Sequence, residues 1–319
     1  MPSKIRLALI GCGGNMRGAH LPRIKANPRV PLTAIADTAP EALAAFAEKW
    51  GNPLPAYADY RGMLRAHALD AVMISSPHSM HYAQARMALE LGCHVLVEKP
   101  LTIRAAHTKA LLDLARRKKR MLHVSYQRHH YPVYRCVRAL VAAGTLGEPR
   151  SVIGYVKQGW GWKQMGWRTV PALSGGGMFM DTGSHLVAAM LFTTGWHVRE
   201  VTAVIDRKNQ PVDILASVAL RFREGALGTI CTVGQAGRHD ERLAIHGTQG
   251  CLVIHLHAWG IKSVLLNNEP LKIPAKYKDD TPDAAFFRWI GGAQGYAPPL
   301  YALEVQRVSE AAYKSARSG

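Results

Sequence analysis

Short apolar runs alternate with helix-like segments over the first 125 residues, and this alternation restricts the fold more than any other feature. The apolar runs are Ile5–Ile10, Leu32–Ala36, Ala71–Ser75, Val95–Val97 and Met121–Val124. Between them, apolar residues recur at helical spacing over Ala39–Trp50, His78–Leu91 and Ala105–Lys118. Buried strands separated by crossover helices form a parallel sheet with both faces covered. The sequence therefore predicts a doubly wound α/β domain over residues 1–125.

After residue 125 the pattern changes to apolar–polar alternation. A helix is expected over Val133–Ala143, a second over Met178–Phe192 and a third over Leu300–Lys314. The alternating segments are Ser151–Lys157, Val201–Asp206, Ala216–Phe222 and Gly228–Val233. Alternation indicates strands with one buried and one exposed face. Residues 126–319 are thus predicted to form a second α/β domain with a mostly antiparallel, open sheet.

Composition narrows the class of protein. Of the 319 residues, 48% are hydrophobic, which excludes a disordered chain, and no apolar run reaches the ~18 residues of a membrane span. The five cysteines are widely spaced and include no C-x-x-C pair, which argues against a disulfide framework or a zinc site. We expect a cytoplasmic protein with no membrane partner and no metal site.

One segment carries half of the net charge of +18. Between Arg104 and Arg138 there are ten basic residues and one acid, Asp113. One interpretation is a patch for nucleic acid or for an anionic substrate, such as a uronate or a nucleotide sugar. The other is a solvated helix C-terminus, where cations suit the helix dipole. No zinc-finger spacing or aromatic RNA-binding strand accompanies the segment, so no nucleic-acid partner is predicted.

A glycine-rich turn follows the first expected strand and precedes a helix. It comprises Gly11, Gly13, Gly14, Asn15 and Met16, with Cys12 between the first two glycines. Such glycines permit a tight turn and let a pyrophosphate approach backbone N–H groups at the helix N-terminus. Met16 occupies the place of the third glycine, so the dinucleotide-binding fingerprint is imperfect.

Asp37 ends the second expected strand, 26 residues after Gly11. A carboxylate there can accept hydrogen bonds from the adenosine ribose and repels a 2′-phosphate. Since Thr38 and Ala39 follow with no arginine beside them, NAD is predicted as the cofactor, with NADP as the alternative. The competing interpretation of Asp37 is a helix N-cap or turn residue.

Three further side chains have the chemistry of a dehydrogenase site. Lys99 lies within Glu98-Lys99-Pro100, at the carboxyl end of a strand, where ligands of open α/β sheets bind. Asp181 and His185 lie four residues apart on an expected helix and so face the same side. The pair has no third residue at metal-ligand spacing, so a metal site is not predicted.

The motifs together resemble those of the Gfo/Idh/MocA family of NAD(P)-dependent sugar and polyol oxidoreductases. The resemblance covers nearly the whole chain, in the order of the family. Its segments are Ser76-Pro77-His78-Ser79-Met80-His81, Gly92 to Pro100, Trp167-Arg168, the triple glycine Gly175–Gly177, Asp181-x-x-x-His185, Gly247-Thr248-Gln249-Gly250 and Ala311 to Arg317.

This resemblance implies a Rossmann domain and a second domain that binds substrate and makes subunit contacts, in a homodimer or homotetramer. It implies Lys99, Asp181 and His185 as the catalytic residues, which also contact a sugar or polyol substrate. Cofactor contacts are expected from the glycine turn, Asp37, and Ser76, Pro77, His81, Glu98, Lys99, Trp167 and Arg168. A second hypothesis is a hydrolase or lyase that retains and recycles NAD, and a third is a non-catalytic NAD-binding protein.

Trp160 and Trp162 belong to a glycine- and tryptophan-rich segment before Trp167. Flat aromatic faces suit the apolar face of a sugar ring, which predicts a substrate contact. Anchoring of the loop or a subunit contact is the alternative.

Overall fold

The computed structural model describes residues 4–161, 165–293 and 295–318. By their contacts these residues divide into two compact units. The first runs to Thr102, continues over Ala106–Ser125 and includes Thr281–Leu300. The second comprises Ile103–Ala105, Tyr126–Asp280 and the residues from Tyr301 onward.

The first unit contains a parallel six-stranded sheet in the order β3-β2-β1-β4-β5-β6, which is the Rossmann order. Its strands are β1 (Leu7–Ile10), β2 (Leu32–Ala36), β3 (Ala56–Tyr57), β4 (Ala71–Ile74), β5 (His94–Val97) and β6 (Leu122–Val124). Its helices are α1 (Leu21–Lys25), α2 (Pro40–Trp50), α3 (Tyr60–Ala66), α4 (His81–Glu90), α5 (Ala105–Lys118) and α9 (Pro282–Ile290). The predicted doubly wound fold is confirmed.

Helix α9 comes from the part of the chain that the sequence assigned to the second domain. It belongs to the first unit because its aromatic side chains enter that unit's core. Phe286 and Phe287 join a cluster with Leu9, Phe46 and Leu96. No local sequence signal marks this return, since the apolar spacing of a helix does not say which core it joins.

The second unit is built on a sheet in the order β14-β13-β12-β11-β7-β10-β9-β8, in which only β7 and β10 pair in parallel. Its strands are β7 (Pro149–Lys157), β8 (Val198–Asp206), β9 (Leu215–Phe222), β10 (Leu227–Val233), β11 (Asp240–Gly247), β12 (Cys251–His257), β13 (Gly260–Leu266) and β14 (Glu269–Pro270). The predicted mostly antiparallel sheet is confirmed.

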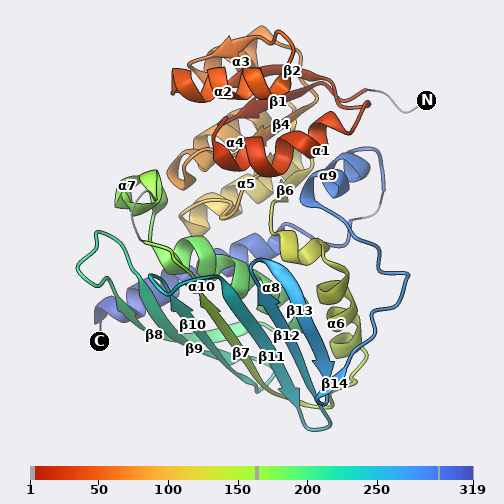
Figure 1. Cartoon of the computed structure of the whole chain (residues 1–319), viewed down its shortest axis with the longest axis vertical. Helices are drawn as coiled ribbons and strands as arrows, with labels where there is room; N and C mark the ends of the chain where they lie inside the picture. The colour runs from red at the N-terminus through yellow and green to blue at the C-terminus, as the bar shows by residue number, and fades with distance from the viewer. Residues whose placement is uncertain (1–3, 162–164, 294, 319) are drawn as a thin grey trace. The chain divides into compact units, whose positions relative to one another are not determined.

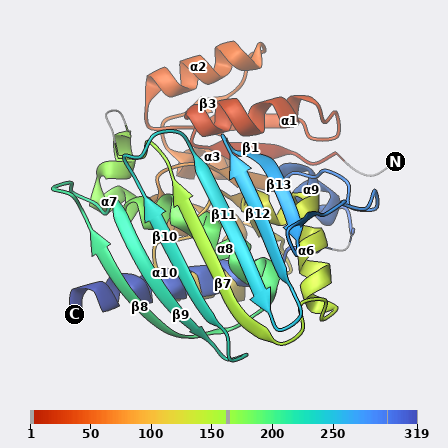
Figure 2. The ribbon, with the colours of Figure 1, turned by 60° about the horizontal axis from the view of Figure 1, so that its bottom comes forward.

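Helices α6 (Pro132–Ala142), α8 (Ser184–Thr194) and α10 (Leu300–Ser318) cover one face of this sheet (Figure 1). Figure 2 shows the opposite face, with the strands toward the viewer. The strands alternate buried and exposed residues, as along β9, because only one face is covered. A short helix, α7 (Pro171–Ser174), precedes the triple glycine.

The helix expected over Met178–Phe192 consists of two pieces. A π-helical turn, Phe179–Gly183, leads into α8, all of whose residues are buried. A second π-helical turn, Met16–His20, follows the glycine turn of the first unit. Among the described helices, none combines the length and apolar character needed to cross a bilayer.

Candidate active site

The glycine turn after β1 is closed at its base and open at its tip. Gly11 has φ +87°, and a Cβ there would lie 2.6 Å from the carbonyl carbon of Ser75, so only glycine fits. A Cβ on Gly13 or Gly14 would meet none of the described atoms within 4 Å. The open tip leaves backbone N–H groups accessible to a pyrophosphate, so the turn fits the predicted dinucleotide.

The two residues after these glycines contribute differently. Asn15 is exposed, and its Nδ2 lies 3.3 Å from the Ser75 hydroxyl. The Met16 side chain is fully buried in the core of the first unit. Met16, in the place of the third glycine, therefore packs the turn onto the sheet and offers only its backbone to a ligand.

Asp37 is both a turn residue and a neighbour of the glycine turn. Its Oδ2 accepts the Cys12 N–H at 2.7 Å, and its Oδ1 accepts the Ala39 N–H at 2.9 Å. A carboxylate has about four acceptor sites, so Asp37 keeps capacity for ribose hydroxyls. Arg17, which the sequence analysis did not single out, donates to the Cys12 carbonyl at 3.2 Å and so places a cation at the same turn.

The loop after β4 is tied to the loop after β5 by a buried histidine. His81 Nδ1 lies 2.9 Å from the Pro100 carbonyl oxygen, and its Nε2 lies 2.9 Å from the Ser76 carbonyl oxygen. Ser76 in turn donates its hydroxyl to Gln84 at 2.6 Å, and Pro77 precedes a short 3₁₀ turn. Burial lowers the pKa of His81, and the neutral imidazole carries one N–H, so the ring donates to one of these two carbonyl oxygens while it packs between Ser76 and Pro100.

Glu98 and Lys99 follow β5 directly, and the Lys99–Pro100 peptide is cis. Glu98 Oε1 accepts from His20 Nε2 at 3.0 Å, and His20 Nδ1 lies 2.6 Å from Asp283 Oδ1 on α9. Asp283 Oδ2 also accepts from Arg23 at 2.7 Å. A buried chain of charges therefore connects α1 and α9 to the residue beside Lys99. Neither His20 nor Asp283 was identified from the sequence, because no local motif links them.

This chain of charges shifts the pKa of its members. Burial alone would lower the pKa of His20, but Asp283 and Glu98 raise it to about 10. Burial would raise the pKa of Glu98, but the hydrogen bond and charge of His20 lower it to about 2. Both groups are therefore charged near neutral pH, and each compensates the other's burial.

Replacement of His20 by glutamine should destabilise the protein in a pH-dependent way. The folded-state pKa of about 10 exceeds the ordinary 6.5, so the His20 contribution is fully present below pH 6.5 and is lost as the pH rises through about 10. The difference in unfolding free energy between the native protein and His20→Gln should shrink by about 2 kcal/mol or more from pH 6 to pH 9. Urea titrations measure it. A difference in unfolding free energy that stays constant with pH would contradict the charged state of His20. As a control, His197→Gln replaces an exposed histidine and should cost less than about 0.5 kcal/mol.

In the second unit, Asp213 holds the triple glycine and the turn that carries Asp181. Its carboxylate accepts the Gly177 N–H at 2.6 Å, the Phe179 N–H at 2.8 Å and the Tyr313 hydroxyl at 2.6 Å. A Cβ on Gly177 would lie 2.1 Å from the Asp213 carbonyl oxygen. Glycine at this position therefore serves close backbone packing.

Asp181 is buried and anchors the tryptophan-rich loop. Its Oδ2 accepts from Trp160 Nε1 at 2.8 Å and from Arg168 Nε at 3.1 Å, and Arg168 lies over the Trp167 ring. Trp160 is itself buried, which favours anchoring over an exposed sugar-stacking face. Trp162 lies outside the described residues.

His185 is the second residue of α8 and is buried. The ring of Tyr126, which follows β6, meets it edge to face at a centroid distance of 6.3 Å. The predicted pair Asp181 and His185 therefore lies within one unit, at the junction of the π-helical turn and α8.

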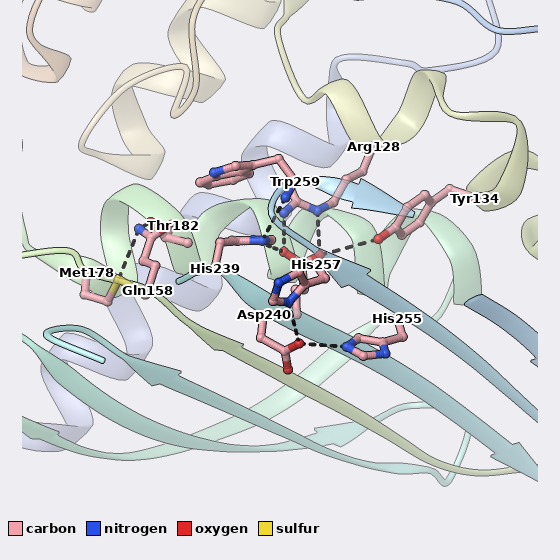
Figure 3. Close-up of polar contacts among 11 residues, drawn as sticks. Arg128, Tyr134, Gln158, Met178, Thr182, His239, Asp240, His255, His257 and Trp259 are labelled. Atoms are coloured by element: carbon pink, nitrogen blue, oxygen red, sulfur yellow. Dashed lines mark hydrogen bonds and ion pairs between the residues drawn. The ribbon is translucent and has the colours of Figure 1, made fainter. Parts of the chain in front are cut away.

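Arg128 and Glu241 form a buried ion pair in the second unit, where Figure 3 shows the Arg128 side chain beside Tyr134 and His239. Arg128 Nε donates to Glu241 Oε1 at 2.6 Å, and its Nη2 donates to Oε2. Burial would raise the pKa of Glu241, but the charge of Arg128 lowers it. Tyr134 also donates to Glu241, at 3.4 Å. The sequence analysis missed this pair.

The basic segment 104–138 is largely explained by internal contacts. Arg116, Arg117 and Lys118 occupy the last turn of α5, where cations suit the helix dipole. Arg128 is paired with Glu241, and Arg138 donates to the Phe192 carbonyl at 2.8 Å. In the described part of the chain, no group of three or more His, Cys, Asp or Glu side chains could hold a metal ion.

Comparison with known proteins identifies similar sugar oxidoreductases. The chain is 38% identical over 148 residues to a dTDP-3,4-didehydro-2,6-dideoxy-α-D-glucose 3-reductase of Streptomyces violaceoruber, which is 46% of this chain and 43% of that protein. It is 32% identical over 196 residues to D-glucoside 3-dehydrogenase of Escherichia coli K12, which is 61% of this chain and 55% of that protein. The chain thus spans about half the length of these relatives.

Solved structures show the same fold. The WlbA dehydrogenase of Bordetella pertussis, crystallised with NADH and UDP-GlcNAcA, aligns with a TM-score of 0.84 and 25% identity over 99% of this chain and 96% of that one. The NAD-binding Rossmann-fold model of the Gfo/Idh/MocA oxidoreductases matches residues 5–126, and the C-terminal domain model of the same family matches residues 134–253. These matches confirm the resemblance seen in the sequence: the chain belongs to the Gfo/Idh/MocA oxidoreductase family.

Proposed function

We propose that this protein is an NAD-dependent oxidoreductase that transfers a hydride between nicotinamide and a secondary alcohol of a sugar, polyol or sugar derivative. The observation that carries the proposal is the match of an NAD-binding fold to residues 5–126, which hold the open glycine turn, Asp37 and Lys99. The chain also keeps Asp181 and His185, the residue types that a secondary alcohol requires for proton transfer.

The chemistry that NAD supplies when bound is hydride acceptance or donation. Histidine titrates near neutrality, so His185 is proposed as the base that takes the hydroxyl proton. Lys99 is proposed to hydrogen-bond the same oxygen and to stabilise the developing alkoxide charge. Asp181, held by Trp160 and Arg168, is proposed to orient His185 or a substrate hydroxyl.

The similar proteins favour a hexose-based substrate. Their names include three dTDP-dideoxyglucose 3-reductases, a D-glucoside 3-dehydrogenase and a levoglucosan dehydrogenase. We therefore propose position 3 of a glucose-derived ring as the first reacting carbon to test. Whether that sugar is free, a glycoside or linked to a nucleotide is part of the same test.

We also propose a homodimer or homotetramer formed through the open face of the second sheet. Ile153, Val204 and Leu227 are exposed large apolar side chains on β7, β8 and β10. The strand register places all three on the face opposite the helices, because Gly154, the neighbour of Ile153, faces Leu186 of α8. Sedimentation velocity tests this arrangement.

The first experiment is to denature the purified protein and identify any released nucleotide by mass spectrometry. An empty protein that reduces added NAD with a glucoside or nucleotide sugar supports a dissociable dehydrogenase. Near-stoichiometric NAD without net NADH formation supports the retained-NAD hydrolase or lyase instead. NAD binding with no turnover of any sugar supports the non-catalytic hypothesis.

Replacement of Asp37 by alanine should weaken NAD binding by about tenfold and NADP binding less, because the lost carboxylate accepts from ribose and repels a 2′-phosphate. Nucleotide titrations monitored by protein fluorescence measure both constants. Since Asp37 also accepts the Cys12 N–H, Asp37→Asn serves as the matched variant that keeps an acceptor oxygen. An unchanged NAD-to-NADP preference in both variants would refute the ribose role.

A further inference from the structure

Trp259 lies in a hairpin turn with a backbone conformation that residues other than glycine rarely adopt. The turn joins β12 to β13, and its flanking residues His257 and Gly260 are paired. The φ angles of the two central residues are +47° at Ala258 and +71° at Trp259. Positive φ at both central positions is the type I′ geometry, for which Asn and Gly are the preferred residues. A bulky tryptophan there is unusual and suggests a function for its side chain.

The next hairpin of the same sheet provides an internal comparison. Asn267 and Asn268, between the paired Leu266 and Glu269, have φ +52° and +67°. At this second turn the same positive φ angles are therefore adopted by asparagines, which tolerate them. The turn itself therefore does not require a tryptophan.

The Trp259 ring is held in one orientation by His239. The two rings stack at a centroid distance of 3.9 Å and an interplanar angle of 15°. The backbone N–H of Trp259 donates to His239 Nδ1 at 3.2 Å, and the backbone N–H of Ala258 donates to the His239 carbonyl oxygen at 3.0 Å. His239 Nε2 lies 3.5 Å from Glu241, which Arg128 holds. His239 thus packs against the Trp259 ring and ties it to the Arg128–Glu241 pair (Figure 3).

The ring is also accessible. Trp259 is 47% exposed, and it is the one exposed tryptophan among the described residues. An exposed aromatic side chain that already packs against a neighbouring ring loses little conformational freedom on binding, which favours stacking of a ligand ring on it.

Strand register places Trp259 at the same end of the strands as the loop that leads to the proposed substrate residues. Lys157, the last residue of β7, pairs with Asp240, the first of β11, and Asp240 pairs with His257, the last of β12. The chain continues from β7 to Trp160, whose indole holds Asp181. His239 and Glu241 face the helical layer, since Glu241 contacts Arg128 and Tyr134, so Trp259 lies on the side of the sheet that carries α8.

We propose that Trp259 is the platform of a second ligand subsite, which stacks the ring next to the reacting sugar in an extended substrate. The shared chemistry is a ring with an apolar face that packs on the indole, supplied by a second sugar of a glycoside or by the base of a nucleotide sugar. The inference rests on the proposed function, because it takes the reacting sugar to lie at Asp181 and His185. It adds that the substrate is larger than a monosaccharide.

The test is calorimetric titration of the full-length protein, with NAD present, with thymidine diphosphate, uridine diphosphate, cellobiose and methyl β-D-glucoside as probes. Either a nucleoside diphosphate or cellobiose should bind, and its Kd should rise about tenfold or more in Trp259→Gly. Glycine adopts positive φ freely, so this variant removes the ring without straining the turn. Trp259→Phe should restore most of the affinity, and Asn268→Gly, the matched change in the next hairpin, should leave it unchanged.

Binding of a nucleoside diphosphate assigns a nucleotide sugar, and binding of cellobiose assigns a glycoside. The inference is overturned if Trp259→Gly binds as tightly as the native protein, or if none of the two-ring or nucleotide probes binds. Because calorimetry needs no turnover, absent hydride transfer with a clear Trp259 effect would refute only the dehydrogenase activity. Normal hydride transfer with no Trp259 effect would refute only the platform.

Discussion

Lys99→Met should lower kcat of hydride transfer by about 10²–10³-fold while leaving the Kd for NAD within about threefold of the native value. The ammonium group is proposed to stabilise charge that develops on the substrate oxygen, so its loss affects the transition state and spares the ground-state nucleotide complex. Methionine keeps the length and apolar stem of lysine. NADH formation at 340 nm, with NAD binding measured by calorimetry, separates the two effects.

Lys109→Met is the matched control, because Lys109 is exposed on α5 and pairs with Asp113. Its kcat should equal that of the native protein. Turnover of Lys99→Met within tenfold of native would remove Lys99 from the catalytic set. An equal loss of NAD binding would instead show that Lys99 supports the nucleotide site.

Glu241→Ala should destabilise the second unit by about 3–5 kcal/mol, because it leaves the Arg128 guanidinium buried without its partner. The side chains of the pair are 2% and 1% exposed, and they join the segment after β6 to β11. The unfolding free energy from urea titration, followed by tryptophan fluorescence, measures the loss. Since the chain has two units, the transition is analysed in separate steps where two appear.

Glu148→Ala serves as the control for this loss. Glu148 pairs with Arg150 at 3.2 Å, but these side chains are 74% and 61% exposed, so the variant should lose less than about 1 kcal/mol. The double replacement of Arg128 by Met and Glu241 by Leu removes both charges and should recover part of the stability of Glu241→Ala. A cost for Glu241→Ala similar to that of Glu148→Ala would contradict a desolvated ion pair.

Much of the fold was predictable because its signals are local. Apolar periodicity placed β2 at Leu32–Ala36 and α5 at Ala105–Lys118, as the structure has them. The first strand begins at Leu7, two residues later than expected from Ile5. Periodicity could not show the π-helical turn before α8, since a change of backbone hydrogen bonding leaves the apolar pattern almost unaltered.

The functional residues divide in the same way. The glycine turn, Asp37, Lys99, Asp181 and His185 stand in short motifs, and the family match confirms the class of protein to which those motifs belong. Their individual roles stay predictions that the variants above test. Asp37 makes the turn contacts that the competing interpretation of a turn residue expected, since it accepts two backbone N–H groups. Its carboxylate can still accept further hydrogen bonds, as the ribose role requires.

By itself the sequence determined the α/β class, the parallel sheet of the first domain through strand–helix alternation, and the family through its motifs, because these depend on neighbours along the chain. The order of the strands in that sheet came from the tertiary structure. Only the tertiary structure decided which buried charges are compensated. His20 meets Asp283 across 263 residues, and Arg128 meets Glu241 across 113. A buried charge requires a partner, but its identity is decided by which elements pack together, and no local pattern encodes that contact.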